Sequence, residues 1–340
     1  MKEKIGVLLV NLGTPDSPKP KDVFRYLNEF LTDGRVIDNS WLMRQMLVRG
    51  LIVPLRFRNS ARSYSAIWTK EGSPLMVYGR KVQLGLQHAL GDSFIVELAM
   101  RYQNPPIKQR LDHLRQAQVE KLIILPLFPQ YASATTGSVH QKVMEIVSKW
   151  DVVPQITFIN SFATHPKMID AFCAQVSQHR LDDYDHLVFS FHGLPQKHLT
   201  KIDKHQRCFK TQGCCEKVCD ENKNCYSAQC YATAHAIVKQ LNITPEKYTV
   251  CFQSRLGSDP WLQPYTTKML QELCSQGKKR ILVMCPAFVC DCLETIYEVR
   301  EEYAQEFKHL GGEKLDLVDG LNDHPIWIEA LQAIVEKHAG

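Results

Sequence analysis

The chain has 340 residues, of which 44% are hydrophobic and 23% charged, and its 41 basic and 36 acidic side chains leave a formal charge of +5. This length exceeds what one hydrophobic core usually holds, so two domains are expected. The mild charge, without an aromatic–basic array, argues against nucleic acid as a partner. No stretch reaches the roughly 20 consecutive apolar residues of a membrane span.

The first ten residues combine early lysines with a short apolar run, and Gly13-Thr14-Pro15 follows at once. This pattern favours a first β-strand over a signal peptide, so a cytoplasmic location is predicted. The chain also carries 12 cysteines. Without an export signal, these argue against a disulfide framework and need another explanation.

Residues 41–62, WLMRQMLVRGLIVPLRFRNSAR, interleave large apolar side chains with arginines. One interpretation is an amphipathic core helix that ends at Pro54. The other is an apolar lip over a cleft, whose arginines bind acidic ligand groups or the phosphates of a membrane surface in a peripheral contact. Periodicity alone does not separate the two, and both stay open.

Three patterns of the first half recur in the same order in the second half. In each pair, an apolar run ends in a similar turn: Leu9–Pro15 with Phe189–Pro195, Phe94–Pro105 with Thr249–Pro260, and Lys121–Tyr131 with Arg280–Asp291. Strands that alternate with helical segments indicate βαβ units and parallel sheets.

The predicted fold is therefore α/β, with two similar Rossmann-like domains that each contain a parallel sheet flanked by helices. We expect the domains at residues 1–162 and 163–340, with the active-site cleft between them and the lip supplied by the first. The last helix, near Pro325–Lys337, is expected to pack back on the first domain.

The loop Phe128–Ser138, FPQYASATTGS, follows a strand of the first domain. Its hydroxyl groups and Gly137 would stand at the start of a helix, where they can cap the helix or bind an anion. Capping is the favoured interpretation.

His192 ends the apolar run Leu187–His192. A buried parallel strand delivers such a side chain to the carboxyl edge of its sheet, where open α/β folds bind ligands. A histidine there often only bonds to a neighbouring loop. Here the phenylalanine-rich approach favours the neutral imidazole that a general base requires.

Glu294 follows a second such run, Ile281–Phe288, and glutamates recur at positions 298 and 302. An α-helix would place all three on one face. A solvated acidic face is the ordinary interpretation of such a row. Because Glu294 follows the strand end directly, the alternative is a ladder of carboxylates that handles a divalent cation and releases it.

Six cysteines lie between positions 208 and 230 in a polar, lysine-rich segment that we interpret as an insertion. Buried apolar cysteines do not explain them, and the spacing lacks the paired C-x-x-C of a zinc ribbon. Four thiolates on a [2Fe–2S] cluster fit better. The expected ligands are Cys208, Cys219, Cys225 and one of an adjacent pair, with Cys215 preferred to Cys214.

Together these motifs resemble the ferrochelatase family, whose members insert ferrous iron into a porphyrin to complete haem synthesis. SFHGLP combined with QSRLGSDPWLQPYT is highly specific for the family. The resemblance covers nearly the whole chain, in the motifs Leu8–Pro15, Gly72–Met76, Arg101-Tyr102, Phe128–Gly137, Ser190–Pro195, Phe252–Thr266 and Cys285–Glu298.

The resemblance implies that His192 takes the pyrrole protons and that iron is inserted around it, with Glu294 as its partner and Glu298 continuing the acidic row. It places Arg56 for a propionate group, with help from Arg58 and Arg62. The remaining porphyrin contacts that it implies are Leu12, Arg101, Tyr102, Tyr131 and Ser133.

Two features depart from the family pattern. Cys292 stands where some members carry a second histidine, which removes the basis for metal delivery from that position. The internal cysteine insertion occurs in only some bacterial members, so its ligand assignment rests on spacing.

The expected activity is insertion of Fe²⁺ into protoporphyrin IX, giving haem b and releasing two protons. Alternatives are a coproporphyrin ferrochelatase and a chelatase for another tetrapyrrole, such as a cobalt–sirohydrochlorin enzyme. A porphyrin carrier without catalysis and an iron–sulfur regulatory protein are further rivals. His192 and Glu294 argue against the carrier.

Overall fold

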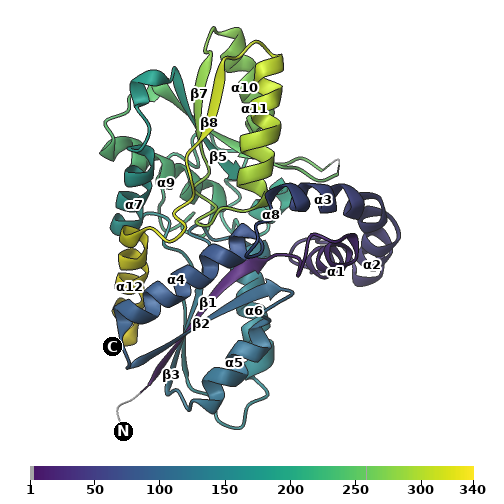
Figure 1. Ribbon diagram of the computed structural model, residues 1–340, viewed down its shortest axis with the longest axis vertical. Helices are drawn as coiled ribbons and strands as arrows, with labels where there is room; N and C mark the ends of the chain where they lie inside the picture. The colour runs from purple at the N-terminus through teal and green to yellow at the C-terminus, as the bar shows by residue number, and fades with distance from the viewer. Residues whose placement is uncertain (1–3, 258) are drawn as a thin grey trace. The chain divides into compact units, whose positions relative to one another are not determined.

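The computed structural model describes residues 4–257 and 259–340. The chain divides into two compact units. The first unit comprises residues up to Phe128, Ser133–Asn160 and Asn322–Gly340, and the second comprises Pro129–Ala132 and Ser161–Leu321. Figure 1 labels their helices and strands.

The first unit contains a four-stranded parallel sheet in the order β2-β1-β3-β4. The central strands are buried on both faces, which explains why they read as unbroken apolar runs. Residues 7–10 of β1, for example, are fully buried. The strands are β1 (Ile5–Gly13), β2 (Phe94–Tyr102), β3 (Lys121–Pro126) and β4 (Gln155–Phe158).

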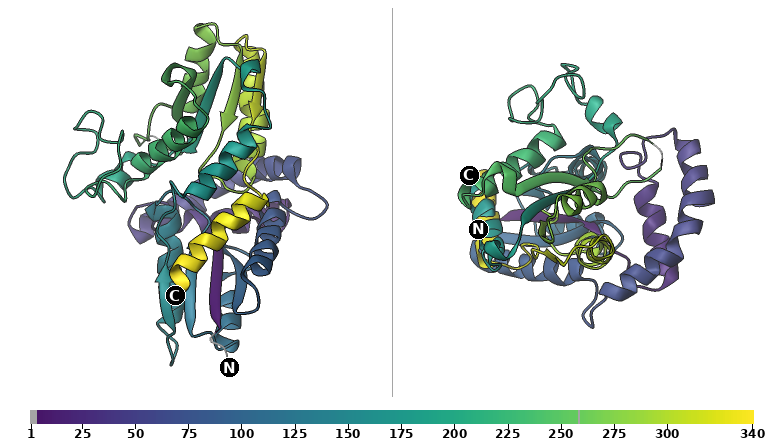
Figure 2. Two further views of the ribbon diagram at one scale, coloured as in Figure 1. Left: turned by 90° about the vertical axis from the view of Figure 1, so that its left-hand side faces the viewer. Right: turned by 90° about the horizontal axis from the view of Figure 1, so that it is seen from above.

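Helices cover both faces of this sheet. One face carries α4 (Pro74–Leu90) and α12 (Pro325–Ala339), which lie against each other in Figure 2. Gly85 permits that approach, because a Cβ there would stand 3.2 Å from Ile328. The other face carries α5 (Ile107–Gln116) and α6 (Ser138–Val147), whose leucines and valines form one apolar cluster with β1 and β3.

Residues 20–67 form a separate group of helices in the first unit. These are α1 (Pro20–Leu31), α2 (Trp41–Leu47), the π-helical turn η1 (Val48–Ile52) and α3 (Val53–Ile67). Pro54 lies in the first turn of α3, where a missing N–H costs little. The interpretation in which Pro54 ends a core helix is therefore wrong.

The second unit repeats the first, with a parallel sheet in the order β6-β5-β7-β8. The strands paired by sequence, β1 with β5, β2 with β6 and β3 with β7, occupy equivalent positions, so the predicted fold class of two similar parallel-sheet units is confirmed. The strands of the second unit are β5 (His186–His192), β6 (Tyr248–Gln253), β7 (Arg280–Met284) and β8 (Lys314–Leu317).

Helices also cover both faces of the second sheet. On one face lie α10 (Thr266–Ser275), the π-helix η5 (Leu293–Tyr303) and α11 (Ala304–His309), which share an apolar cluster with β5, β7 and β8. The other face carries α7 (Pro166–Val176) and α9 (Tyr226–Gln240). Short elements complete the two units: η2 (Ser133–Gly137), η3 (Leu181–Asp183), α8 (Gln196–Thr200) and η4 (Pro245–Lys247).

Both units require glycine at the carboxyl end of a central strand: Gly13 is the last residue of β1, and Gly193 directly follows β5. Gly13 has φ +125°, and a Cβ there would lie 2.2 Å from the carbonyl oxygen of Tyr102 at the end of β2. A Cβ on Gly193 would lie 2.9 Å from the carbonyl oxygen of Ser254 beyond β6. Each glycine therefore lets the central strand end in close contact with its neighbour.

No helix among the described residues is both long and apolar enough to cross a membrane.

Two buried histidines should make the fold sensitive to acid. Burial lowers the pKa of His140 and of His186 to about 4, below the unfolded value of about 6.5. Because the native state disfavours the charged form, the free energy of unfolding should fall between about pH 6.5 and 4, by about 1.4 kcal/mol per pH unit for each group.

Urea unfolding across this pH range tests the prediction. His140→Leu and His186→Leu should each flatten the dependence, whatever they do to stability at neutral pH. Unchanged slopes in both variants would contradict it.

Candidate active site

His192 is the last residue of β5 and is half-buried. Its Nδ1 lies 2.6 Å from the carbonyl oxygen of Gly193. A carbonyl oxygen only accepts, so Nδ1 carries the proton, and in the neutral ring Nε2 then keeps a free lone pair. The hydroxyl of Tyr226 donates to the His192 carbonyl oxygen at 2.9 Å. The geometry therefore presents Nε2 as the basic nitrogen.

Aromatic rings flank this imidazole. The ring centroid of His192 lies 6.4 Å from that of Trp261 and 6.3 Å from that of Phe288. Trp261 belongs to the segment after β6, and Phe288 follows β7. The basic nitrogen thus stands in a largely apolar setting at the carboxyl edge of the second sheet.

The acidic row lies on the π-helix η5, not on the α-helix that the sequence predicted. Glu294, Glu298 and Glu302 are spaced by four residues, and this spacing keeps them on neighbouring turns in either kind of helix. Burial, followed by the charge of Glu298, raises the pKa of Glu302. The row therefore concentrates negative charge along one side of η5.

Gln253 joins the histidine strand to the acidic row. It pairs with His192 in the β5–β6 register, and its Nε2 donates to the backbone oxygen of Glu294 at 3.0 Å. The same Nε2 lies 3.4 Å from Oε2 of Glu298. Gln253 lies within a family-like motif, but its role could not be predicted from the sequence, because its partner on η5 is distant along the chain.

Cys292 caps the start of η5, where its thiol accepts from the N3 backbone and Thr295 bonds back to the Cys292 backbone. Burial, with the nearby Glu294 carboxylate and a hydrogen bond to it, raises the pKa of the Cys292 thiol well above its usual value. The thiol therefore stays neutral and donates to Glu294.

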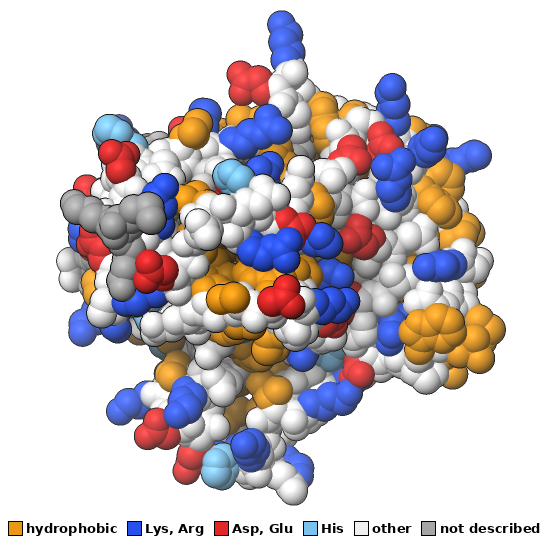
Figure 3. All heavy atoms as spheres, turned by 90° about the horizontal axis from the view of Figure 1, so that it is seen from below, with side chains coloured by type: hydrophobic (Ala, Val, Ile, Leu, Met, Phe, Trp, Pro, Cys, Tyr) orange, Lys and Arg blue, Asp and Glu red, His pale blue; other side chains and the backbone are white. Residues whose placement is uncertain are grey.

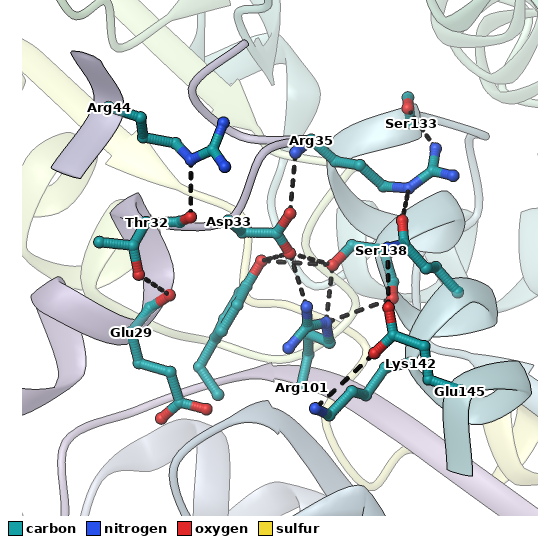
Figure 4. A network of polar contacts seen from close by, with 12 residues as sticks. Glu29, Thr32, Asp33, Arg35, Arg44, Arg101, Ser133, Ser138, Lys142 and Glu145 are labelled. Atoms are coloured by element: carbon teal, nitrogen blue, oxygen red, sulfur yellow. Dashed lines mark hydrogen bonds and ion pairs between the residues drawn. The ribbon is translucent and has the colours of Figure 1, made fainter. Parts of the chain in front are cut away.

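In the first unit, Arg101 and Tyr102 at the end of β2 converge on Asp33 (Figure 4). Arg101 Nη2 lies 2.6 Å and Tyr102 Oη 2.9 Å from Asp33 Oδ2, and Arg101 Nε donates to Ser138 Oγ at 2.6 Å. Burial opposes ionisation of Asp33, but bonds from Ser138 and the Arg35 backbone, with the Arg101 charge, lower its pKa.

Asp33 is a residue that sequence reasoning missed, because only a turn-like Thr-Asp-Gly marks it and its partners lie far along the chain. The network holds Arg101 and Tyr102 in fixed orientations. It also employs the Ser138 hydroxyl, whereas Gly137, the N-cap of α6, makes no side-chain capping bond. Because Gly137 is itself helical and continues η2 into α6, the capping role expected for this loop stays a prediction.

The other predicted porphyrin contacts are dispersed within their units. Ser133 Oγ accepts from Arg35 Nη1 at 2.8 Å, and half-buried Leu12 lies one residue before the end of β1. Arg56 is exposed on α3 and outside the Asp33 network. In the second unit, the backbone N–H of Tyr131 donates to Gln229 Oε1 at 2.7 Å.

The cysteine segment runs between α8 and α9 and appears as an extended loop in Figure 2. Sγ of Cys214 and Sγ of Cys215 lie 3.7 Å apart. Burial and Asp203, with charge interactions from those two thiols, raise the pKa of Cys208 to about 12. A hydrogen bond from Cys215 lowers the pKa of Cys225.

Four thiols of the loop thus interact electrostatically, while Cys219 is exposed and its backbone N–H bonds to Asn222 Oδ1. No group of three or more histidine, cysteine or acidic side chains with metal-holding geometry occurs in the described part of the chain.

The two repeated parallel sheets, each flanked by helices, define the fold class of this protein. Two solved structures share the fold. SirB from Bacillus subtilis with Fe³⁺ is 12% identical, with a TM-score of 0.53, and the match covers 99% of this chain and 96% of SirB. The sirohydrochlorin chelatase SirB from Bacillus subtilis subspecies spizizenii with cobalt is 10% identical, with a TM-score of 0.55, and the match covers 98% of this chain and 94% of that chain.

The sequence profile described as Ferrochelatase matches residues 4–339. Proteins named ferrochelatase are similar to the chain over almost its whole length. One from Coxiella burnetii (strain Dugway 5J108-111) is 43% identical and covers 98% of this chain and 94% of its own. One from Legionella pneumophila (strain Lens) is also 43% identical, with 98% of each chain covered. The chain belongs to the ferrochelatase family.

Proposed function

We propose that this chain inserts Fe²⁺ into protoporphyrin IX, forming haem b and releasing two protons. Family membership supports the reaction class. The observation that carries the chemistry is the bond between His192 Nδ1 and the Gly193 carbonyl oxygen, since it selects the neutral tautomer in which the Nε2 lone pair is free at the sheet edge. This nitrogen is the base that accepts the pyrrole protons.

The inserted iron needs ligands that release it again. The sequence predicts His192, Glu294 and Glu298, because oxygen ligands bind a divalent ion loosely enough for transfer. Of these three, His192 and Glu294 are the proposed ligands. Glu294 supplies the negative charge that attracts Fe²⁺ and accepts protons from His192. The link through Gln253 supports cooperation between the base and the row.

A flat porphyrin must be bent before a metal can enter its plane. That strain is drawn from binding contacts away from the reacting nitrogens. A rigid Arg101–Tyr102 pair, held by Asp33, suits this task. The proposed contacts are Leu12, Arg56, Arg101, Tyr102, Tyr131 and Ser133, with Arg56 on a propionate.

Parallel anaerobic assays test the substrate. Protein with Fe²⁺ is offered protoporphyrin IX, coproporphyrin III and, with Co²⁺, sirohydrochlorin. We expect the highest kcat/KM with protoporphyrin IX. Faster insertion into coproporphyrin or sirohydrochlorin would replace the proposed substrate but keep the reaction class.

We further propose that the cysteine loop holds a [2Fe–2S] cluster through Cys208, Cys215, Cys219 and Cys225. Mutual interaction of Cys208, Cys215 and Cys225 supports three of these ligands. Cys219 is exposed, so the loop around it must fold inward to complete the set. A bound cluster would supply one-electron chemistry and tie the loop to the start of α9.

Purified protein is expected to be brown and to contain iron and acid-labile sulfide in equal amounts. Cys215→Ser and Cys225→Ser should remove the visible absorbance, because each deletes a thiolate. Cys230→Ser is the matched control, since Cys230 is fully buried within α9. Colourless protein that contains zinc would contradict the cluster.

The state of the cysteines also supports the cytoplasm as the location. None of the 12 cysteines, all of which lie among the described residues, forms a disulfide, and Cys219 is exposed. A reducing compartment keeps such thiols unoxidised.

The lip segment 41–62 supports peripheral contact with an anionic membrane surface. Trp41, Leu42 and Met46 are each more than half exposed, and Figure 3 shows hydrophobic side chains gathered at its right-hand edge, the side where Figure 1 draws α2. Arg49 and Arg56 are exposed in the same segment. Apolar anchors beside arginines suit a surface of acidic headgroups.

Sedimentation with phosphatidylglycerol vesicles tests this contact. Changing Trp41, Leu42 and Met46 together to serine should weaken binding at least about tenfold. Leu84→Ser is the control, because Leu84 is equally exposed on α4. Equal binding by wild type and the triple variant would refute membrane docking by the lip.

A further inference from the structure

The carboxylate of Glu298 is almost fully occupied by hydrogen-bond donors. Ser254 Oγ lies 2.9 Å from Oε1 and 2.8 Å from Oε2. The hydroxyl of Tyr303 donates to Oε1 at 2.6 Å, and Gln253 Nε2 stands 3.4 Å from Oε2. A carboxylate offers about four lone-pair positions, so three donors leave little room for a metal ion.

These donors are held in place by their own surroundings. Gln253 is 1% exposed, and its Oε1 accepts from Ser190 Oγ at 2.8 Å and lies 3.5 Å from Cys285 Sγ. Its amide nitrogen must therefore face Glu298. Tyr303 is buried on η5 itself.

Ser254 adopts an uncommon backbone conformation, with φ +58°. Residues other than glycine rarely adopt the left-handed region, and such strain persists where surrounding contacts enforce it. Here the enforcing contact is the bond from the Ser254 hydroxyl to Glu298, which fixes the chain just beyond β6 against η5.

Glu294 differs, although it lies only one turn earlier. Its side chain is paired with the thiol of Cys292, and a thiol is a weak donor. Its carboxylate oxygens therefore keep acceptor capacity for a metal ion or a proton. The tie between η5 and β6 also sets the position of Glu294, because Gln253 binds both the Glu294 backbone and the Glu298 carboxylate.

We propose that Glu298 is a positioning residue, which together with Ser254 and Tyr303 holds the π-helix η5 against the end of β6. Of the two glutamates Glu294 and Glu298, only Glu294 then binds the iron that is inserted. This division of roles rests on the proposed iron insertion. It removes Glu298 from the iron ligand set and assigns a role to Ser254 and Tyr303, two residues with none so far.

The experiment compares Glu298→Gln with Glu294→Gln and Glu298→Ala, using KM for Fe²⁺ and kcat as separate readouts. Glutamine keeps the shape of Glu298 and an oxygen that accepts from Tyr303 and Ser254. Glu298→Gln should therefore leave KM for Fe²⁺ unchanged and kcat within about threefold of wild type. Glu298→Ala should lower kcat by about 10²-fold, because it removes the clamp.

A rise in KM for Fe²⁺ in Glu298→Gln as large as that in Glu294→Gln would overturn the proposal. Tyr303→Phe gives an independent arm, since it should lower kcat and leave KM for Fe²⁺ unchanged. Its matched control is Tyr297→Phe on the same helix, which should leave both constants unchanged. Equal effects of the two tyrosine changes would also contradict the clamp.

Titration with Co²⁺ separates this inference from the proposed function, because it needs no turnover. The cysteine loop is the same in every variant, so differences in Co²⁺ affinity between variants come from the changed carboxylates. Glu294→Gln should weaken Co²⁺ binding and Glu298→Gln should not. The reverse order would refute the clamp even in an active enzyme, whereas an inactive wild type with the expected order would refute only the proposed reaction.

Discussion

His192→Ala is expected to abolish iron insertion while porphyrin still binds. The alanine removes the one nitrogen whose lone pair the Gly193 contact leaves open. Loss of a general base lowers a rate by about 10²–10⁴-fold, and loss of a metal contact adds to this. Anaerobic haem formation gives the rate, and quenching of protein fluorescence gives porphyrin affinity.

His192→Asn sharpens the test. Its side-chain amide can still donate to the Gly193 carbonyl oxygen, but it offers no basic nitrogen. We therefore expect it to be as inactive as the alanine variant. His88→Ala, an exposed histidine on α4, is the control for loss of an imidazole elsewhere. An alanine variant at position 192 that turns over at the wild-type rate would refute the assignment.

Glu294→Gln is the second change with a large expected effect. The amide matches the carboxylate in shape but carries no charge and binds Fe²⁺ poorly. We expect kcat/KM for Fe²⁺ to fall by about 10²-fold, with porphyrin affinity unchanged. Steady-state kinetics at varied Fe²⁺ measure the change.

Glu301→Gln provides the matched control, because Glu301 is exposed on the same π-helix. It should remain active, since the net charge lost is the same and only the position differs. If both variants lost activity equally, the effect would come from overall charge, and Glu294 would have no special role.

The sheets could be predicted because their strands are buried on both faces. Residues 281–284 of β7 are at most 1% exposed, and such strands appear in a sequence as unbroken apolar runs. The repeated strand order then indicated the duplicated fold. The π-helix η5 could not be predicted, since glutamates four residues apart fit an α-helix equally well.

Candidate site residues could be predicted only where they lie close to an apolar run. His192 ends one such run, and Glu294 lies on the helix that follows another. The roles of Asp33 and Gln253 could not be predicted, because they depend on partners far along the chain. The partner of Asp33, for example, is Arg101. The spacing of the cysteines also could not decide whether Cys214 or Cys215 is the better candidate ligand. Their sulfur atoms lie only 3.7 Å apart.

Anaerobic mixing of the purified wild-type protein with Fe²⁺ and protoporphyrin IX, followed by absorbance and porphyrin fluorescence, decides whether the chain catalyses iron insertion. We expect repeated turnover, with fluorescence lost as the haem spectrum grows and two protons released for each haem formed. Tight porphyrin binding with lasting fluorescence and no haem after Fe²⁺ is added would contradict it.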